Sequence, residues 1–293
     1  MDIPHIQNDA DWGKLVHQLN KPSTEVLGSY FPTTTSVATI VENLRHILLA
    51  PYFNKADGDQ QLCTLLRQTQ DMLLGEVSCC LQGGQQSPKK AEEEAATIVT
   101  KALNSLPEIQ SSLERDIDAA FQMDPSVLNK AEAVSCLPGI NAMVHYRIAH
   151  CLWRLKVPTL PRFISSLCQS ATGIDIHPSA QLGDGIFMDH GTGIVVGATA
   201  IIGNNVTIYQ GVTLGAKSFP RDQDGQIKKG LPRHPIVEDD VTIYAGATIL
   251  GRITIGGGAV IGGNVWITQD IARGAQIRQT PFQQSYFHQG SGI

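Results

Sequence analysis

A six-residue repeat of branched aliphatic residues runs through the second half of the chain, from Ile176 to about Ile267. Its longest uninterrupted series is Val237, Ile243, Ile249, Ile255, Ile261 and Ile267. Neither an α-helix nor an ordinary strand meander has this period. A solenoid of short stacked strands does, with three hexapeptides in each triangular coil. The pattern therefore predicts a left-handed parallel β-helix rather than a β-sandwich with glycine turns.

The repeat is interrupted twice, and each interruption holds a histidine. The step across His190 is eight residues instead of six. A longer polar segment between Leu214 and Val237 has no six-residue pattern, and it predicts a loop outside the solenoid that ends at His234. Because a regular stack tolerates insertions mainly where they serve a binding face, both interruptions indicate candidate sites.

Glycine directly follows many of the aliphatic positions. A coil turns its corner there, so that either a positive φ or the lack of a side chain would be useful. These glycines are Gly183, Gly197, Gly203, Gly215, Gly256 and Gly262.

The preceding residues show the spacing of amphipathic helices. Helices are expected over 34–49, 59–81, 92–106, 108–121, 140–153 and 161–171. Asp124 followed by Pro125 predicts one more helix start, with Asp124 as its N-cap. Asp116 and Asp118 are expected to be solvated.

The length of 293 residues allows two domains. We expect an all-α N-terminal domain over 1–172, a β-helix domain over 173–271 and a C-terminal tail over 272–293. The helical domain can cap the start of the solenoid, which is the end that lacks a preceding coil.

Composition narrows the classes of function. A net charge of -5 gives no reason to expect nucleic acid or anionic membranes as partners. No apolar run approaches the length of a membrane span, and the N-terminus lacks the features of a signal peptide. The 6 cysteines precede the solenoid and form no C-x-x-C pair. We therefore expect reduced thiols in a cytoplasmic protein rather than disulfides or a zinc site.

His190 is a candidate general base. Asp175 precedes it by 15 residues, which is nearly one 18-residue coil, so the carboxylate would lie almost beneath the imidazole. Such a carboxylate fixes the histidine tautomer and raises its basicity, which suits proton removal from a hydroxyl. Two alternatives stay open: His190 only caps a turn, or His177 is its partner.

Arg233 and Asp124 are charges of opposite sign that could hold an amino-acid zwitterion. Arg233 would take the carboxylate by a forked hydrogen bond, and Asp124 would take the ammonium group. Alternatively, Asp124 is only a helix cap and Arg233 only a loop charge. The chain has no G-x-S-x-G motif, which argues against that type of serine nucleophile and leaves direct acyl transfer through a general base.

The motifs together resemble serine O-acetyltransferase, a family of hexapeptide-repeat acyltransferases. The motifs that carry the resemblance are residues 173–178, 188–197, 210–215 and 233–235 in the solenoid. Two further motifs precede the solenoid, at residues 124–125 and 146–150. The resemblance covers roughly residues 124–270. It implies transfer of an acetyl group from acetyl-CoA to the hydroxyl of L-serine, giving O-acetyl-L-serine for cysteine biosynthesis.

The resemblance also implies residue roles. His190 would be the general base, and Asp175 would support it. Serine would be bound by Asp124, Asp189, Arg233 and His234. His234 would contact the serine hydroxyl or the developing negative charge. Acetyl-CoA would lie between the solenoids of neighbouring subunits, against Gly215, Ala216, Ala245 and Gly263. No metal is expected.

A site between neighbours requires a homo-oligomer of at least three copies. A trimer and a dimer of trimers both stay open, because the residues before about 120 match the family's usual N-terminal domain poorly. The resemblance also implies that the C-terminal Ile293 inserts into O-acetylserine sulfhydrylase. Sensitivity to feedback by cysteine stays open.

Three other functions remain possible on the residues alone. One is a hexapeptide O-acyltransferase with a different donor or acceptor. Another is a metalloenzyme of the β-helical carbonic anhydrase type, for which His177, His190 and His234 would have to converge. The last is a non-catalytic scaffold for the sulfhydrylase.

Overall fold

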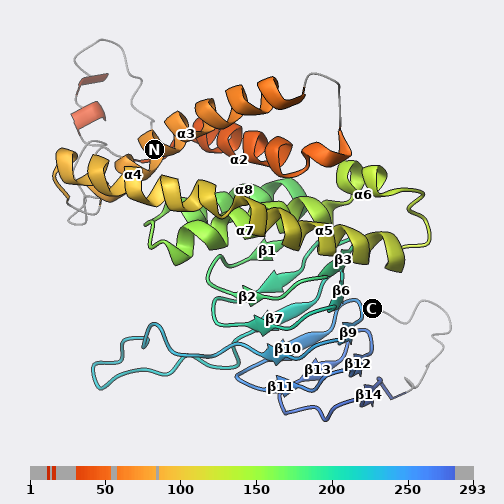
Figure 1. The fold of residues 1–293 in the computed structure, drawn as a ribbon. Coiled ribbons are helices and arrows are strands. Elements are labelled where there is room, and N and C mark those ends of the chain that lie inside the picture. The colour runs from red at the N-terminus through yellow and green to blue at the C-terminus, as the bar shows by residue number, and fades with distance from the viewer. Residues whose placement is uncertain (1–11, 14, 18–30, 54–57, 84–85, 281–293) are drawn as a thin grey trace.

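The computed structural model describes residues 12–13, 15–17, 31–53, 58–83 and 86–280. A layered group of helices sits on one end of a three-sided prism of short strands (Figure 1). Among these residues, none of the helices combines the length and the apolar character that crossing a membrane requires.

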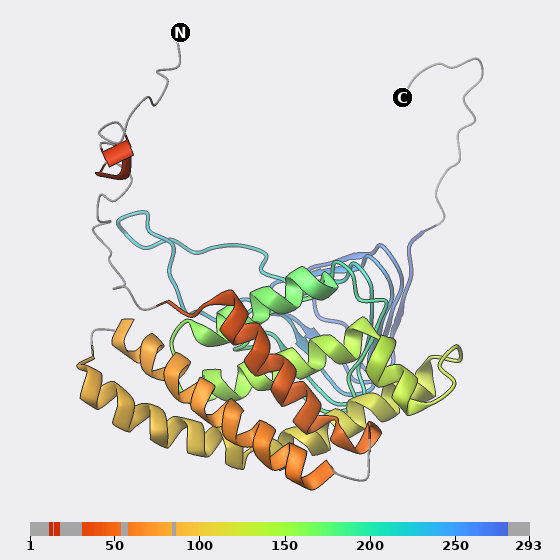
Figure 2. The same ribbon diagram turned by 90° about the horizontal axis from the view of Figure 1, so that it is seen from above.

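The helices follow the predicted ranges closely. They are α2 (Thr34–Leu48), η1 (Ala50–Tyr52), α3 (Gly58–Gly83), α4 (Pro88–Asn104), α5 (Leu106–Met123), α6 (Lys130–Cys136), α7 (Pro138–Arg154) and α8 (Leu160–Thr172). The pairs α2·α3 and α3·α4 pack together on the far side, whereas α5, α7 and α8 contact the first coil (Figure 2). Gly173 ends α8 in the left-handed conformation, at φ 73°, and turns the chain into the first strand.

The strands stack in parallel into three faces, each named after its first strand. The β1 face contains β1 (Asp175–Ile176), β4 (Val195–Val196), β7 (Thr213–Gly215), β10 (Thr248–Leu250) and β13 (Trp266–Ile267). The β2 face contains β2 (Gln181–Leu182), β5 (Ile201–Ile202), β8 (Ile236–Val237) and β11 (Thr254–Ile255). The β3 face contains β3 (Phe187–Asp189), β6 (Thr207–Tyr209), β9 (Thr242–Ile243), β12 (Val260–Ile261) and β14 (Gln276–Ile277).

The repeated aliphatic residues form the core of the prism, as the six-residue period predicts. Ile176 pairs in register with Val196, and Val196 pairs with Leu214. Val237, Ile243, Ile249, Ile255, Ile261 and Ile267 are all at most 6% exposed. The last strand, β14, lies within residues 272–293, the range that the sequence predicts to be a C-terminal tail.

Both interruptions of the repeat occur where expected. The extra residues after Met188 lengthen the turn that holds His190, so that Asp175 pairs with Val195 in the next coil. The polar segment leaves the prism between β7 and β8 as a long loop (Figure 1). An isolated antiparallel bridge between Arg221 and Ile227 closes its tip.

Close stacking, not positive φ, explains the glycines that follow the aliphatic positions. None of the six belongs to the residues with positive φ, which include Gly185 and Asn205 two residues further on. A Cβ at Gly183 would lie 2.7 Å from the carbonyl oxygen of Gly203 in the next coil. Such a contact is far too short for a real Cβ, so glycine is needed where the coils touch.

A buried ion pair joins the helices to the first coil, and it contradicts the prediction that Asp116 is solvated. Asp116 is 0% exposed. It accepts hydrogen bonds from Arg147 Nε at 2.7 Å, Arg147 Nη2 at 2.9 Å and the backbone N–H of Ile186 at 2.9 Å. Asp116 lies three residues after Leu113 and four before Ala120, and therefore on the buried stripe of α5.

The predicted helix start at Asp124 is also wrong. Asp124 is the C-cap of α5, and its Oδ1 accepts hydrogen bonds from the backbone N–H and Oγ of Ser126. The next helix starts later because Asn129 supplies its N-cap, with Oδ1 accepting from the N–H of Glu132 at 2.9 Å. The turn between these helices leaves Asp124 available at the surface of the first coil.

Replacing Asp116 with alanine should destabilise the protein by about 3–5 kcal/mol, because Arg147 would be left buried without its partner. The free energy of unfolding, from urea denaturation followed by circular dichroism, measures the loss. Asp118→Ala on the same helix is the control, since its pair with Lys130 is half exposed and is worth at most about 1 kcal/mol. Equal effects of the two substitutions would contradict the role of the buried pair.

Candidate active site

The predicted site residues lie along two of the three edges of the prism. The His190 edge consists of the turns that lead from the β3 face to the β1 face. The His234 edge consists of the turns that lead from the β1 face to the β2 face. Strands of the β1 face run between these two edges in each coil.

His190 projects into solvent from the first turn of its edge. Its φ is 56°, a conformation that residues other than glycine adopt rarely and that often marks a functional turn. The side chain is 75% exposed, and Nε2 lies 3.8 Å from Oδ1 of Asp189. Among the described residues, His190 forms no ion pair with Asp175, whose backbone N–H donates to Ile194. The proposed support by Asp175 stays a prediction.

Asp124 comes close to His190 from the helical layer. The hydrogen bonds from Ser126 lower the pKa of Asp124 below its ordinary value, and the charge of His190 lowers it further. The N-terminus of α7 contacts the same coil, since a Cβ at Gly139 would overlap the carbonyl oxygen of Met188. The helices thus hold a carboxylate within electrostatic range of the histidine.

Tyr209 belongs to the same group, although it is not among the residues that the sequence motifs single out. It pairs in register with Asp189 and stacks on Tyr244 at 5.0 Å between ring centroids. Burial raises the pKa of Tyr209, and the negative charges of Asp189 and Asp124 raise it further, so the phenol lies near both carboxylates. The signal available in the sequence was its position one coil after Asp189 along the repeat.

The His234 edge holds the other predicted residues. His234 is 6% exposed, and its Nδ1 accepts the backbone N–H of Thr199 at 3.1 Å. The hydroxyl of Thr199 lies 2.8 Å from the same nitrogen and accepts the N–H groups of Arg233 and His234. Thr199 was not selected from the sequence, because it lies 35 residues from His234 along the chain.

These contacts define the state of the His234 ring. Because Nδ1 accepts a hydrogen bond from a backbone N–H, the proton of the neutral ring is on Nε2. Burial lowers the pKa of His234 to about 4, and the charges of Arg233 and Arg252 add to the effect. At neutral pH the residue is therefore an uncharged hydrogen-bond donor through Nε2.

Gly197 and Arg252 keep the ring in place. A Cβ at Gly197 would overlap the imidazole, so only glycine leaves room for it. Arg252 Nη1 donates to the carbonyl oxygens of Thr199 at 2.6 Å and His234 at 3.1 Å. The turn that carries Arg233 and His234 is thereby tied to the coils on both sides.

The residues expected at acetyl-CoA divide between the same two edges. Gly215 ends β7 and Ala216 follows it on the His234 edge, whereas Ala245 and Gly263 follow β9 and β12 on the His190 edge. All four are half exposed. A single chain therefore presents each predicted binding set in two separated halves.

The three histidines of the metalloenzyme alternative do not converge within one chain. His177 and His234 are close enough for His234 to lower the pKa of His177, whereas His190 is on the other edge. No group of three or more potential metal-ligand residues occurs in the described part of the chain.

Comparison with known proteins gives consistent relatives, although no family model matches the chain. A plasmid serine acetyltransferase of Synechococcus elongatus is 40% identical over 308 residues, covering 96% of this chain and 95% of that protein. The serine acetyltransferase of Bacillus subtilis is 42% identical over 54% of this chain and 69% of that protein.

Solved structures agree with these relatives. Serine acetyltransferase 1 of Entamoeba histolytica in complex with L-cysteine has a TM-score of 0.74 at 33% identity, over 91% of this chain and 96% of that one. Soybean serine acetyltransferase complexed with serine has a TM-score of 0.56 at 29% identity, over 85% of this chain and 98% of that one. The likeness confirms the expected fold class, a helical region followed by a left-handed parallel β-helix.

Gly197→Ala should raise the pKa of His234 from about 4 towards its ordinary value of about 6.5, because the new methyl group expels the ring from its buried slot. Titration of ¹⁵N-labelled histidines by NMR should show His234 neutral at pH 5.5 in the parent and largely protonated in the variant. Gly75→Ala is the control, since its Cβ would meet no atom within 4 Å. An unchanged pKa in Gly197→Ala would contradict the slot.

Proposed function

The chain belongs to the serine acetyltransferase family and is thus an acyltransferase, and we propose that it transfers the acetyl group of acetyl-CoA to L-serine at a site shared by two neighbouring copies. The observation that carries this proposal is the division of the predicted residues between two edges of one prism. Both the serine set and the acetyl-CoA set are divided in the same way.

A threefold trimer would reunite the two halves. If three prisms surround an axis with their β1 faces inward, each His190 edge meets the His234 edge of the next copy. Trp266 on the β1 face is 70% exposed and Tyr244 on the His190 edge is 43% exposed, so this arrangement would also cover large apolar side chains. Pairing of two trimers through the helical layer would be a further step.

The charges on the His190 edge and the His234 edge suit a zwitterionic substrate. Arg233 would bind the serine carboxylate, and its Nε is buried without a hydrogen-bond partner among the described residues. Asp124 and Asp189 would bind the ammonium group from the opposite edge. The serine hydroxyl would then point towards His190, which is the exposed base of the site.

The reaction would proceed by direct acyl transfer. His190 would remove the hydroxyl proton as the serine oxygen attacks the thioester carbonyl of acetyl-CoA. The carbon–sulfur bond would break, and His190 would return the proton to the departing CoA thiolate. The neutral His234 would donate its Nε2–H to the oxygen on which negative charge develops. Asp175 could support His190 if the exposed imidazole turned towards β1.

Acetyl-CoA would lie in the groove between the two edges. The small residues Gly215, Ala216, Ala245 and Gly263 would let its pantetheine arm approach the backbone. The long loop adds four exposed cations near the His234 edge, which suit the phosphates of CoA. These are Lys217, Arg221, Lys228 and Lys229.

The remaining parts of the proposal concern partners and location. Ile293, which would insert into O-acetylserine sulfhydrylase, lies outside the described residues. A cytoplasmic location is supported by the 6 cysteines, all of which are free. A different acyl donor or acceptor and a non-catalytic scaffold are the competing functions, and assays of CoA release with L-serine and with other alcohols separate them.

His190→Ala should lower kcat by roughly 10²–10⁴-fold, because the general base is lost. The measurement is L-serine-dependent release of CoA, followed with a thiol reagent. His46→Ala removes an exposed histidine from α2 and should leave the rate unchanged. Full activity of His190→Ala would contradict the assigned base, and CoA release with another alcohol but not with L-serine would contradict the substrate.

Co-expression of His190→Ala and His234→Ala subunits should restore activity that neither variant has alone. In mixed trimers, about a quarter of the interfaces would join an intact His190 edge to an intact His234 edge. The expected rate is therefore about a quarter of the parental rate at equal amounts of the two chains. If the mixture stayed as inactive as the separate variants, the shared site would be ruled out.

A further inference from the structure

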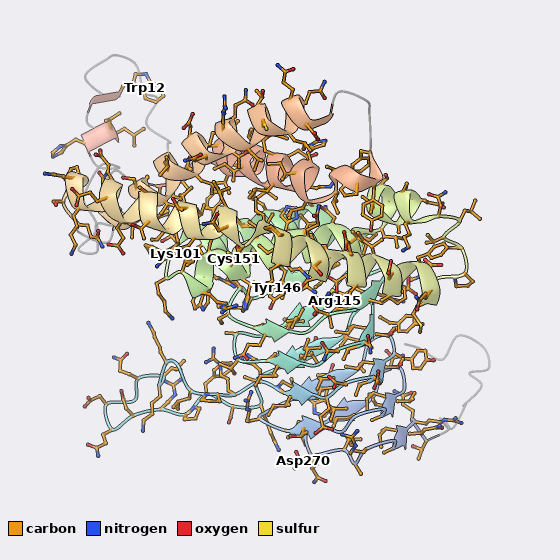
Figure 3. The ribbon with its side chains drawn as sticks, viewed as in Figure 1. Trp12, Lys101, Arg115, Tyr146, Cys151 and Asp270 are labelled. Carbon is orange, nitrogen blue, oxygen red and sulfur yellow. The ribbon has the colours of Figure 1, made fainter. Side chains whose placement is uncertain are left out.

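A cavity of about 470 Å³ lies between the helical layer and the β2 face, apart from both edges that carry the site residues. Its walls come from the end of α4, from α5 and α7, and from the first coil at Leu182 to Asp184. Figure 3 shows Lys101, Cys151, Tyr146 and Arg115 in a row along this junction. The volume lies in the range of small-molecule sites, and none of the proposed chemistry uses it.

Two cations of the cavity wall have no ionic partner. Arg147 pairs with Asp116, and Asp184 pairs with Arg115 at 2.7 Å. In contrast, Lys101, Arg154 and Glu108 form no ion pair within the described parts of the chain. After the paired charges are set aside, the cavity retains two cations and one carboxylate in a protein of net charge -5.

Arg154 and Glu108 both line the cavity, and Arg154 lies near two groups of its inner wall. Its charge contributes to lowering the pKa of His150 and limits the rise in the pKa of Cys151, and both of these residues line the cavity. Glu108 acts on the same thiol with the opposite sign. The unpaired cation and carboxylate therefore face one space.

The inner wall adds neutral polar groups. His150 Nδ1 donates to the carbonyl oxygen of Pro178 at 2.8 Å, and burial lowers the pKa of this histidine. Its Nε2 is therefore unprotonated at neutral pH and can accept a hydrogen bond from a ligand. Ser105 Oγ and Cys151 Sγ lie 3.1 Å apart beside it. Ile109, Leu155 and Leu182 supply apolar surface between these groups.

We propose that this cavity binds a small organic anion, whose carboxylate or phosphate group pairs with Lys101 and Arg154. A hydroxyl or amino group on the same molecule meets Glu108 and Nε2 of His150. The ligand thereby bridges α4 and α7 over the first coil. Because Tyr146 and Arg147 in the same wall hold that coil, occupancy stabilises the junction of helices and solenoid.

The test is isothermal titration calorimetry with inorganic phosphate, citrate and L-aspartate at low ionic strength, where charge pairing is least screened. At least one of the three should bind with one site per subunit and raise the thermal unfolding midpoint. Lys101→Ala/Arg154→Ala should weaken this binding by roughly tenfold or more, because two charge-assisted contacts are lost. Lys101→Gln/Arg154→Gln, which removes the charges but keeps polar side chains in the wall, should have the same effect.

The matched control is Arg67→Ala/Lys89→Ala, which removes two exposed cations of α3 and α4 that do not line the cavity. Its affinity for the probe should equal that of the parent. The proposal is overturned if no probe binds, if the cavity variant Lys101→Ala/Arg154→Ala binds the probe as well as the control does, or if Arg233→Ala abolishes binding. The last result would assign the anion to the serine site instead.

Discussion

The first coil of a β-solenoid has no coil above it, so its outward backbone groups need partners from elsewhere. The helical layer supplies them at defined points. Tyr146 Oη donates to the carbonyl of Ala180 and accepts the N–H of Leu182, while Asp116 accepts the N–H of Ile186. Arg147 joins this set by donating to Gly183 and to Asp116. Breaking the Asp116–Arg147 pair would therefore leave a buried charge without its partner and would also remove a hydrogen bond to the first coil. The same contacts orient the end of α5, where Asp124 approaches His190.

The regular part of the prism is rigid, and the candidate catalytic residues His190 and His234 lie at its two interruptions. Stacked coils are so close that Gly183 and Gly203 cannot carry a side chain. At Gly197 the close packing instead holds a catalytic candidate in place, because the ring of His234 fills the space that a methyl group would occupy. A neutral imidazole with a fixed tautomer is thus produced by packing, and Thr199 and Arg252 hold the surrounding turn. His190, on the lengthened turn, is instead left exposed for proton transfer.

The sequence predicts the fold well because both of its signals are local. Six-residue spacing specifies the coils, and amphipathic spacing specifies the helices, so their bounds agree with the structure to within a few residues. The burial of Asp116 does not follow from the sequence, because a charge on a helix is solvated unless a distant partner compensates it. That partner, Arg147, is 31 residues away. The predicted helix start at Asp124 is wrong because Asn129, five residues later, is the N-cap of α6. The role of Thr199 cannot be predicted from the sequence, because the long loop separates Thr199 from His234, the histidine that it positions.

The motifs name the candidate residues, but only the three-dimensional stacking divides them between edges. Each edge collects turns from successive coils, so residues far apart in sequence, such as Asp189 and Gly263, share one edge. Arg233 is closer to His190 along the chain than Gly263 is, and yet it lies across the β1 face from it. An arrangement that keeps a base and its complementary cation on opposite edges is of no use to an isolated chain. It becomes useful once a rotated copy presents the missing edge, which would make catalysis depend on assembly.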